Sequence, residues 1–228
     1  MASGIPPFRG PGGLWNDPQV ERFAHREILD TDPMAAWKFF GALRETARNA
    51  KPNAAHDALV RFENDLGPGQ RFLLVTQNVD GLHQRAGSRS MVELHGSVLR
   101  TRCSRYECPL AAYEDDDAHA EVFPVCAACG SVLRPDIVFF GEFCNPAADR
   151  AVKKALRDCD LFISVGTSGT VYPANGFVRS AHFAGALTIY MNLEAMDPPN
   201  PCFQETILGK AEEVLPDLLG KTPGSTEG

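Results

Sequence analysis

The sequence predicts an α/β fold, a doubly wound parallel sheet into which a small second module is inserted. Four short apolar runs have the length of buried strands, and they lie at residues 72–75, 137–140, 161–165 and 187–191. Stretches with helical spacing separate the later runs, and such alternation is typical of a parallel sheet covered by helices. Four cysteines lie between the first two runs and predict the inserted module. A chain of 228 residues, 44% of them hydrophobic, can bury one full core with such an insertion.

Helices are predicted on both sides of the cysteine cluster. The first 17 residues are rich in glycine and proline, which predicts a loop. Helical spacing over residues 18–66 predicts a helical module, which is interrupted near residue 32 and resumes after Asn53, a typical helix cap. Further helices are predicted over residues 145–159, after residue 173 and over residues 211–219. The polar residues 220–228 predict a disordered tail.

The composition argues against two classes of partner. The net charge of -7 and the pI near 5.4 disfavour a nucleic-acid surface, because phosphate binding needs clustered Lys and Arg. No apolar run approaches the roughly 20 residues of a membrane helix, and the N-terminal MASGIPPFRG lacks the apolar core of a secretory signal. We therefore expect a cytoplasmic protein that binds neither nucleic acid nor membranes. The sequence leaves the oligomeric state open.

The four clustered cysteines predict one structural zinc ion. Cys103 and Cys108 form one pair, Cys126 and Cys129 form a second, and four thiolates complete a tetrahedral zinc shell. A catalytic zinc is not expected, because four sulfur ligands leave no open position. The alternatives are that the cysteines bind no metal, or that His119 replaces one of them. The odd total of seven cysteines also favours a reducing compartment over a disulfide framework.

These elements divide the chain into two predicted modules. Residues 98–135 form a zinc-ribbon module around the cysteines. Residues 1–97 and 136–228 form a doubly wound α/β domain, which includes the helical module at about residues 18–66.

Polar side chains follow the first predicted strand, at the place where an open α/β sheet binds its ligands. The segment TQNVDGLH places Gln77, Asn78 and Asp80 there, where Asn78 and Asp80 could bind a sugar and an amide or could only cap a helix. His95 follows in the segment VELHGSV. Its neutral imidazole could accept a proton near pH 7, or the residue could be structural. The polar cluster that precedes it favours the role of base.

Segments at the later strand ends suit the binding of phosphate, ribose or peptide. The segment VGTSGTVYPA exposes backbone N–H groups before a helix, which attracts phosphate, although one glycine loop is a weak signal. Asn192 and Glu194, in the segment NLE, could bind a ribose or form only a surface turn. The segment PDIVFFGE could pair with an extended peptide by strand addition, or it could be a core strand.

These segments resemble, in the same order, the motifs of the sirtuin (Sir2) family of NAD-dependent protein deacylases. The matching segments are SGIPPFRG, TQNVDGLH, ELHG, the paired cysteines, VFFGE, GTS and NLE, and they span almost the whole chain. The resemblance implies a Rossmann-type NAD-binding domain and a small domain that combines a zinc ribbon with the helical module. It implies two cofactors, NAD and one structural Zn²⁺, and an acyl-lysine protein or peptide as partner.

The resemblance also implies the reaction. The acyl oxygen of a modified lysine attacks the nicotinamide ribose of NAD, nicotinamide leaves, and His95 removes a proton from a ribose hydroxyl as the base. Hydrolysis then gives free lysine and an O-acyl-ADP-ribose. Asn78 and Asp80 complete the implied catalytic set by orienting ribose and nicotinamide, with Gln77 beside them.

The binding residues are implied by the same resemblance. Phe8 and Arg9 correspond to the family's mobile cofactor loop, in which an aromatic ring excludes water from the ribose and an arginine offers charge to the cofactor. The other implied NAD-binding residues are Ser3, Gly4, Ile5, Pro6, Gln77, Asn78, Asp80, Gly166, Thr167, Ser168, Asn192, Glu194 and Ala211. The implied substrate-binding residues are Phe40, Leu43, Val138, Phe139, Phe140 and Gly141.

The N-terminus departs from the family pattern. Family members carry a strand and a glycine loop of the type GAG-x-S upstream of SGIP, whereas this chain begins with MASGIP. That loop cradles phosphate, and that strand is central in the sheet. We therefore expect either a chain truncated at its N-terminus or impaired cofactor binding.

The helical module departs from the pattern of the class III-like bacterial branch, which the chain otherwise resembles. That branch often carries Tyr-x-x-Arg to bind acidic acyl groups, and Phe40 and Leu43 stand at these positions. Phenylalanine lacks the phenolic hydroxyl, leucine cannot pair with a carboxylate, and Arg44 would face elsewhere on a helix. Acetyl or other neutral acyl groups are therefore expected rather than succinyl.

A deacylase, with a deacetylase favoured, is the leading functional prediction. The alternatives are desuccinylase activity, ADP-ribosyl transfer to protein, and a non-catalytic module that binds NAD or ADP-ribose without its glycine loop. A zinc-ribbon nucleic-acid binder is disfavoured, because the acidic insertion between Cys108 and Cys126 would repel phosphate.

Overall fold

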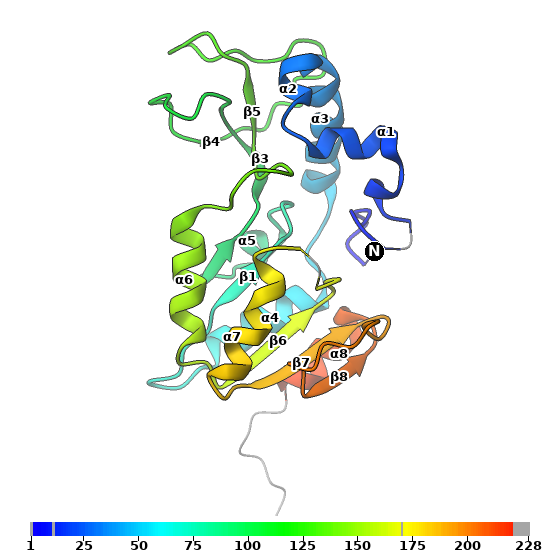
Figure 1. The fold of residues 1–228 in the computed structure, drawn as a ribbon, viewed down its shortest axis with the longest axis vertical. Helices are drawn as coiled ribbons and strands as arrows, with labels where there is room; N and C mark the ends of the chain where they lie inside the picture. Colours follow the sequence, from blue (N-terminus) through cyan, green and yellow to red (C-terminus); the bar gives the residue numbers. More distant parts are fainter. Residues whose placement is uncertain (1, 11, 170, 221–228) are drawn as a thin grey trace, which may run out of the picture. The chain divides into compact units, whose positions relative to one another are not determined.

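The computed structural model describes residues 2–10, 12–169 and 171–220, which form two compact units (Figure 1). The first unit comprises Met1–Lys51, Thr76–Leu82 and Glu93–Cys144, and the second comprises Pro52–Val75, His83–Val92 and Asn145–Gly228. The predicted zinc-ribbon segment lies within the first unit, and the predicted domain boundaries at 97 and 136 stay a prediction. Apart from Gly220, which ends the last helix, the predicted disordered tail lies outside the described residues. None of the helices in the described ranges is long and apolar enough to cross a membrane.

The first unit begins with a series of helices. They are η1 (Leu14–Asn16), α1 (Pro18–Glu21), η2 (Arg22–Ala24), α2 (Ile28–Thr31) and α3 (Pro33–Asn49). The side chain of Asp32 caps α3 by accepting a hydrogen bond of 3.0 Å from Ala35 N–H, and Pro33 occupies the first turn. The predicted interruption near residue 32 is therefore confirmed, and the cap is its cause.

An antiparallel sheet completes the first unit. Its strand order is β4–β3–β5, with β4 at Tyr113–Glu114, β3 at Gly96–Cys103 and β5 at Leu133–Ile137. The strand β3 was not predicted, because its residues do not alternate regularly between buried and exposed. The prediction of a strand at residues 137–140 was wrong. The strand β5 ends at Ile137, where Val138 N–H makes the last bond of the ladder, to His95 O. Phe140 N–H then donates to Ala24 O, in an isolated bridge with His25.

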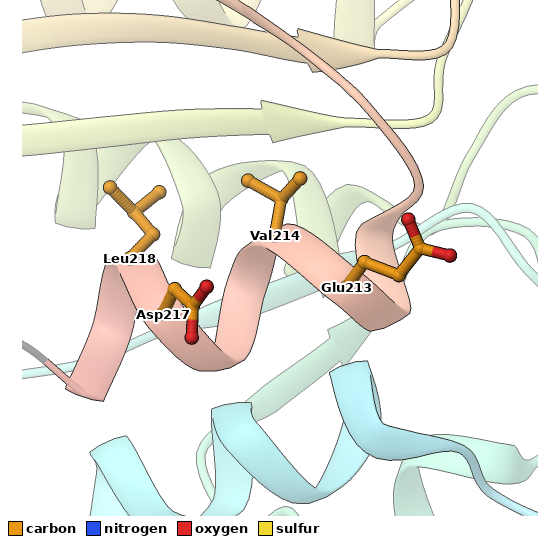
Figure 2. Close-up of a pocket in the computed structure, with 4 residues that line it drawn as sticks. All are labelled: Glu213, Val214, Asp217 and Leu218. Carbon is orange, nitrogen blue, oxygen red and sulfur yellow. The ribbon is translucent and has the colours of Figure 1, made fainter.

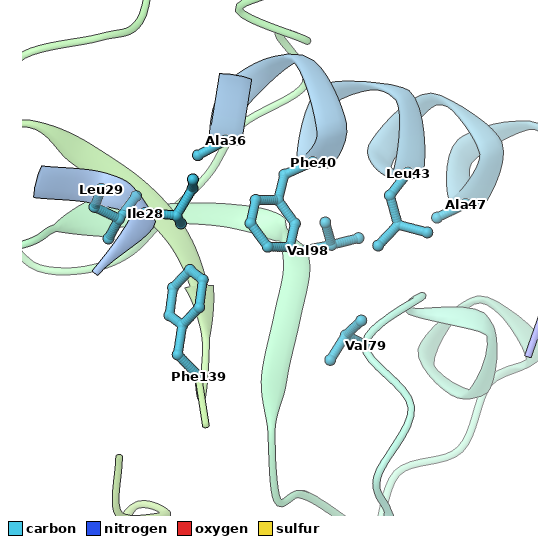
Figure 3. Packing of buried hydrophobic residues seen from close by; sticks show 9 residues of the cluster. All are labelled: Ile28, Leu29, Ala36, Phe40, Leu43, Ala47, Val79, Val98 and Phe139. Carbon is cyan, nitrogen blue, oxygen red and sulfur yellow. The ribbon is translucent and has the colours of Figure 1, made fainter. Parts of the chain in front are cut away.

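The hydrophobic core of the first unit lies between α2, α3 and the sheet (Figure 3). It is formed by Ile28, Leu29, Ala36, Phe40, Leu43, Ala47, Val79, Val98 and Phe139. Figure 3 shows Phe40 and Leu43 pointing from α3 toward Val98. The ring of Phe40 packs edge-on against that of Phe139, with centroids 5.6 Å apart.

A buried arginine joins α3 to the sheet. The Arg44 side chain is 1% exposed, and it donates hydrogen bonds to Val98 O (2.9 Å) and Thr101 Oγ1 (3.0 Å). It also pairs with Asp115 at 3.2 Å. Burial alone would raise the pKa of Asp115, but hydrogen bonds from Thr101 and His119 and the charge of Arg44 lower it to about 2. The pair is therefore ionised, and the Arg44 side chain is held by groups of the sheet and by Asp115. That Arg44 faces away from the acyl-site positions stays a prediction.

The second unit contains the parallel sheet, which has the order β6–β7–β8. Its elements are α4 (Ala54–Asn64), β1 (Leu74–Thr76), α5 (Leu82–Ala86), β2 (Met91–Glu93), α6 (Pro146–Leu156), β6 (Leu161–Val165), η3 (Ala174–Gly176), α7 (Phe177–Phe183), β7 (Leu187–Asn192), β8 (Glu205–Leu208) and α8 (Ala211–Gly220). Of these elements, the end residues Thr76, Leu82 and Glu93 belong to the first unit. In Figure 1, α7 lies in front of these strands and α8 behind them. The core residues Met191 and Leu215 join β7 to α8, and α4 packs on α8.

Most predicted elements of the second unit are confirmed. The two strands at 161–165 and 187–191, the two helices at 145–159 and 211–219, and the cap at Asn53 are observed. The burial of two strands was predicted wrongly. β6 is the outer strand of its sheet, and β1 pairs with β2 alone among the described strands, so that residues 72–75 and most of β6 are only half-buried. The polar, exposed β8 was missed.

Replacing Arg44 with Ala should destabilise the first unit by about 3–5 kcal/mol, because Asp115 would remain buried and charged without its partner. Urea unfolding followed by tryptophan fluorescence measures this unit, since Trp15 and Trp37 both belong to it. Arg48→Ala is the matched control. Arg48 lies on the same helix and pairs with Asp116 at 4.0 Å, but it is exposed, and its loss should cost at most about 1 kcal/mol. Equal losses in the two variants would contradict the prediction.

Candidate functional site

Two of the predicted segments lie side by side in the first unit. Leu94 N–H donates to Thr76 O at 2.9 Å, and Val98 N–H donates to Val79 O at 2.8 Å. These bonds hold the polar segment TQNVDGLH against the segment ELHG. The backbone segment that carries Gln77, Asn78 and Asp80 therefore runs beside the segment that carries His95.

The imidazole of His95 is held in one orientation by the polar segment. Its Nδ1 lies 3.0 Å from Gln77 O. A carbonyl oxygen only accepts, so Nδ1 carries the proton and Nε2 of the neutral ring carries a lone pair. Burial lowers the pKa of His95 below its ordinary value, although the bond to Gln77 O opposes this shift. The neutral ring, with Nε2 able to accept a proton, therefore prevails at neutral pH.

The turn after His95 requires glycine. Gly96 has φ of +74°, and a Cβ atom on it would lie 2.0 Å from Asp136 O. Any side chain would push β3 away from β5. Val138 N–H donates to His95 O at 3.0 Å from the other side. The backbone of His95 is therefore fixed by two neighbouring segments.

Asp80 caps a helix in this structure. Its Oδ1 accepts a hydrogen bond of 2.9 Å from Leu82 N–H at the beginning of α5. Asn78 N–H donates to Thr76 Oγ1 at 3.1 Å, and the Asn78 side chain is exposed. The capping role that the sequence left open is thus observed for Asp80. A role of both side chains in binding a ligand is a proposal.

The predicted cofactor loop of residues 3–9 rests on aromatic side chains of the same unit. The Phe8 ring stacks on Trp15, with centroids 5.0 Å apart, and the Arg9 guanidinium lies 5.3 Å from the centroid of the Phe140 ring. Trp15 N–H donates to Phe8 O at 2.9 Å. The sequence did not identify Trp15 as the residue that supports this loop.

The four predicted metal ligands form one cluster. Their sulfur atoms all lie within 4.8 Å of one another, with Cys103 and Cys129 3.5 Å apart and Cys108 and Cys126 3.6 Å apart. Tetrahedral zinc with bonds of about 2.3 Å places its sulfur ligands about 3.8 Å apart, so the cluster fits this ion. His119 is not a member and instead contacts Asp115 at 2.9 Å.

The thiols of the cluster also suit a bound metal. Burial raises the pKa of Cys103 to about 12, so its thiol would stay protonated unless a metal ion displaced the proton. Hydrogen bonds from Ser131 lower the pKa of Cys129 to about 6. Arg105 N–H points at the Cys103 sulfur at 3.4 Å, as expected for a zinc knuckle. These cysteines could therefore hold the predicted structural zinc.

The second unit brings together its predicted loops at the ends of β6 and β7. Gly166, with φ of +63°, donates its N–H to Met191 O at 2.9 Å. Thr167 O accepts hydrogen bonds of 3.2 Å from both Tyr190 and Asn192. Sequence analysis missed Tyr190, although a residue two positions before Asn192 on a strand lies on the same face.

The other predicted residues of this unit lie around these loops. Ser168 and Glu194 are exposed, and Ala211 is the first residue of α8. Figure 2 shows a shallow hollow on α8, lined by Glu213, Val214, Asp217 and Leu218. Its two carboxylates would repel the phosphates of a dinucleotide. The hollow is therefore not a candidate site for the cofactor phosphates.

Comparison with known proteins decides the family. The model of the Sir2 family matches residues 1–173, which is more than half of the chain. The chain belongs to the Sir2 family. This Sir2 chain is 44% identical over 219 residues to the "NAD-dependent protein deacylase 2" of Pyrobaculum aerophilum, a match that covers 95% of this chain and 84% of the relative. The resemblance seen in the sequence and the predicted fold class are thereby confirmed.

Solved structures of Sir2 proteins have the same fold. A mutant Sir2 homologue in complex with ADP-ribose superposes with a TM-score of 0.87 at 36% identity, covering 96% of this chain and 85% of that one. A Sir2 protein bound to an acetylated peptide superposes with a TM-score of 0.77 at 28% identity, covering 88% and 83%.

Replacing Cys103 with Ser should reduce bound zinc from one ion per chain to nearly none, because three thiolates and a hydroxyl bind zinc far more weakly than four thiolates. Elemental analysis of the purified protein measures the metal. Cys159→Ser is the control, since Cys159 lies outside the cluster and donates to Leu161 O. Zinc retained at one ion per chain in Cys103→Ser would overturn the assignment.

Proposed function

We propose that this Sir2 protein is a NAD-dependent protein-lysine deacylase, with a deacetylase favoured. The observation that carries the proposal is the orientation of His95, whose Nδ1 is held by Gln77 O and whose Nε2 can accept a proton. Relatives named NAD-dependent protein deacylase at 40–44% identity over most of the chain support it. Its reaction would give nicotinamide, free lysine and an O-acyl-ADP-ribose.

The residues of the chain have separate tasks in this reaction. Bound NAD supplies a ribose carbon that reacts with the acyl oxygen of the substrate and releases nicotinamide. His95 Nε2 accepts a proton from a ribose hydroxyl, because its pKa leaves the ring neutral at pH 7. Asn78 and Asp80, with Gln77 beside them, orient the ribose and the amide. Phe8 excludes water, and Arg9 offers positive charge to the cofactor.

The loops of the second unit would hold the rest of the cofactor. The segment Gly166, Thr167 and Ser168 follows β6, and its residues Gly166 and Ser168 are exposed, which suits a phosphate. Asn192 and Glu194 follow β7 and would bind the adenosine ribose, and Ala211 would contact the adenine. The hydrogen bonds from Tyr190 and Asn192 to Thr167 O support this arrangement, since they keep the two loops together. With residues 3–6 and the residues named above, these positions complete the proposed NAD site.

The acyl group would meet an apolar surface. Phe40 and Leu43 are buried, 2% and 7% exposed, and carry no group that pairs with a carboxylate. Arg44 is occupied by Asp115, Thr101 and Val98 O and is not available to bind an acid. These contacts support acetyl or another neutral acyl group as the substrate.

Segment 138–141 would contact the substrate peptide. Phe139 is 2% exposed, and its aromatic ring belongs to the core. The N–H groups of Val138 and Phe140 donate within the chain, so a peptide would bond to other backbone groups of Val138, Phe140 and Gly141. A reducing compartment such as the cytoplasm is part of the proposal, because the four metal-spaced cysteines need to stay reduced to bind zinc.

The proposal predicts release of nicotinamide from NAD that depends on an acetyl-lysine peptide. His95→Asn should lower kcat by a factor of about 100 to 10,000, the range that a general base contributes. Chromatography of nicotinamide and mass spectrometry of the peptide measure the two products. Binding of NAD without release of nicotinamide by the wild-type protein would instead favour the binding-module alternative. Label from NAD on the protein rather than the peptide would favour ADP-ribosyl transfer.

The pH dependence supplies an independent test of His95. Burial lowers its pKa, so the neutral, active form persists to lower pH than for an ordinary histidine. Activity should therefore be retained at pH 6.5 and fall only as the pH drops through the lowered pKa. Loss of half the activity at or above pH 7 would contradict this orientation of the base.

The acyl preference gives a further prediction. The value of kcat/KM should be higher for an acetyl-lysine peptide than for the same peptide with succinyl-lysine. Leu43→Arg, or better Phe40→Tyr combined with Leu43→Arg, should raise succinyl turnover by supplying the missing hydroxyl and charge. Lys38→Arg is the control, because it lies on the exposed face of α3. Faster turnover of succinyl than acetyl by the wild-type protein would overturn the preference.

A further inference from the structure

We propose that Arg134 and Glu142 are positioning residues that shape the substrate-binding segment 138–141. This role rests on the proposed function and deepens it. The ion pair, whose arginine is fully buried, would raise the affinity for the peptide without contacting the reacting groups. Neither residue was singled out for a role by the motifs of the sequence. Both belong to the first unit.

Arg134 and Glu142 flank segment 138–141 in the sequence. Arg134 lies on β5, before the segment, and its side chain is fully buried at 0% exposed. Glu142 lies directly after the segment. The guanidinium contacts both carboxylate oxygens of Glu142, through Nη1 to Oε1 and through Nη2 to Oε2, the latter at 2.8 Å. Such a two-pronged contact fixes the relative orientation of both side chains.

The same two side chains bind the backbone of the segment. Arg134 Nη2 donates to Ile137 O, where the chain leaves the sheet. Glu142 Oε2 accepts a hydrogen bond of 3.0 Å from Phe139 N–H, and Glu142 N–H donates to Phe139 O at 3.1 Å. The guanidinium also lies 4.3 Å from the centroid of the Phe139 ring. The backbone and the Phe139 ring of segment 138–141 are therefore held by Arg134 and its partner Glu142.

This arrangement explains why an apolar sequence, VFF, leaves the sheet. The N–H group of Phe139, at the centre of VFF, donates to the Glu142 carboxylate. In a continued strand, the acceptor would be a carbonyl oxygen of the neighbouring strand. Val138 and Phe140 thereby flank Phe139 in a fixed conformation, with Phe139 buried as the anchor. Without the pair, a substrate peptide would have to order these residues as it binds, and the lost conformational entropy would weaken its binding.

The expected signature is a selective effect on the peptide. Glu142→Gln keeps an oxygen that accepts from Phe139 N–H but removes the charge, and Glu142→Ala removes both. We expect the KM for an acetyl-lysine peptide to rise by roughly tenfold in Glu142→Ala and by less in Glu142→Gln. The KM for NAD should change by much less than the KM for the peptide, because the segment meets the proposed cofactor residues only where the Phe140 ring lies under Arg9.

Glu142→Ala leaves Arg134 buried without its carboxylate, and this variant can fail to fold. The double variant Arg134→Met with Glu142→Gln avoids that problem, since two neutral side chains of similar size replace the ion pair. It should fold and still show the raised KM for the peptide. Arg26 lies 4.0 Å from Glu142 and is 40% exposed, so Arg26→Gln should have a much smaller effect than either change to the pair.

Trp37→Phe is the control for a general loss of stability. It removes a buried hydrogen bond of 2.8 Å to Leu133 O in the same unit but does not touch the segment. A purely structural role of the ion pair would give the double variant the kinetics of Trp37→Phe. Measuring the affinity for a fluorescent acetyl-lysine peptide by anisotropy, without turnover, adds a second reading of the same effect.

The outcomes separate the two proposals. An active wild-type enzyme whose folded double variant keeps the wild-type KM and affinity for the peptide overturns the positioning role alone. A wild-type protein that neither binds the peptide nor releases nicotinamide overturns the deacylase proposal and the inference with it. A selective rise in the peptide KM, smaller in Glu142→Gln than in Glu142→Ala, supports both.

Discussion

The site in the first unit depends on one constraint, the close packing of three backbone segments around His95. The last residue of β1, Thr76, accepts from Leu94 N–H, and Val79 after it accepts from Val98 N–H. Val138, directly after β5, donates to His95 O. Gly96 makes this packing possible, because no other residue leaves room for Asp136 O. The imidazole Nδ1 then lies within hydrogen-bond distance of Gln77 O, which determines the nitrogen that carries the proton. The chemistry proposed for His95 is therefore a consequence of backbone packing.

Two fully buried arginines organise the surroundings of that site. Arg44 satisfies carbonyl, hydroxyl and carboxylate groups between α3 and the sheet, and Arg134 does the same between β5 and the segment that follows it. A guanidinium suits this task because its five N–H groups can bind several backbone oxygens at once. Each charge is balanced by one carboxylate, Asp115 or Glu142. Polar groups in loops that have no sheet partner are thus satisfied without water.

In the second unit, the positions of the proposed cofactor loops follow from the pairing of parallel strands. The ends of β6 and β7 lie side by side, so Thr167 and Asn192 meet without any buried charge. Tyr190, two residues before Asn192 on β7, also donates to Thr167 O. The cofactor loops proposed for this unit therefore rest on regular secondary structure, whereas the catalytic base of the first unit rests on irregular segments held by side chains.

The sequence by itself determined the features that depend on neighbouring residues: the helix interruption near residue 32, the cap at Asn53, two strands of the parallel sheet, the family, and the spacing of the cysteines that meet in one cluster. Tertiary structure decided where distant hydrogen-bonding groups find their partners. Only it shows that VFF leaves the sheet, that Asp80 caps α5 and that Glu142 binds Phe139 N–H. The physical reason is that apolar periodicity reports which residues avoid water, while each backbone N–H group takes whichever acceptor the fold brings within reach.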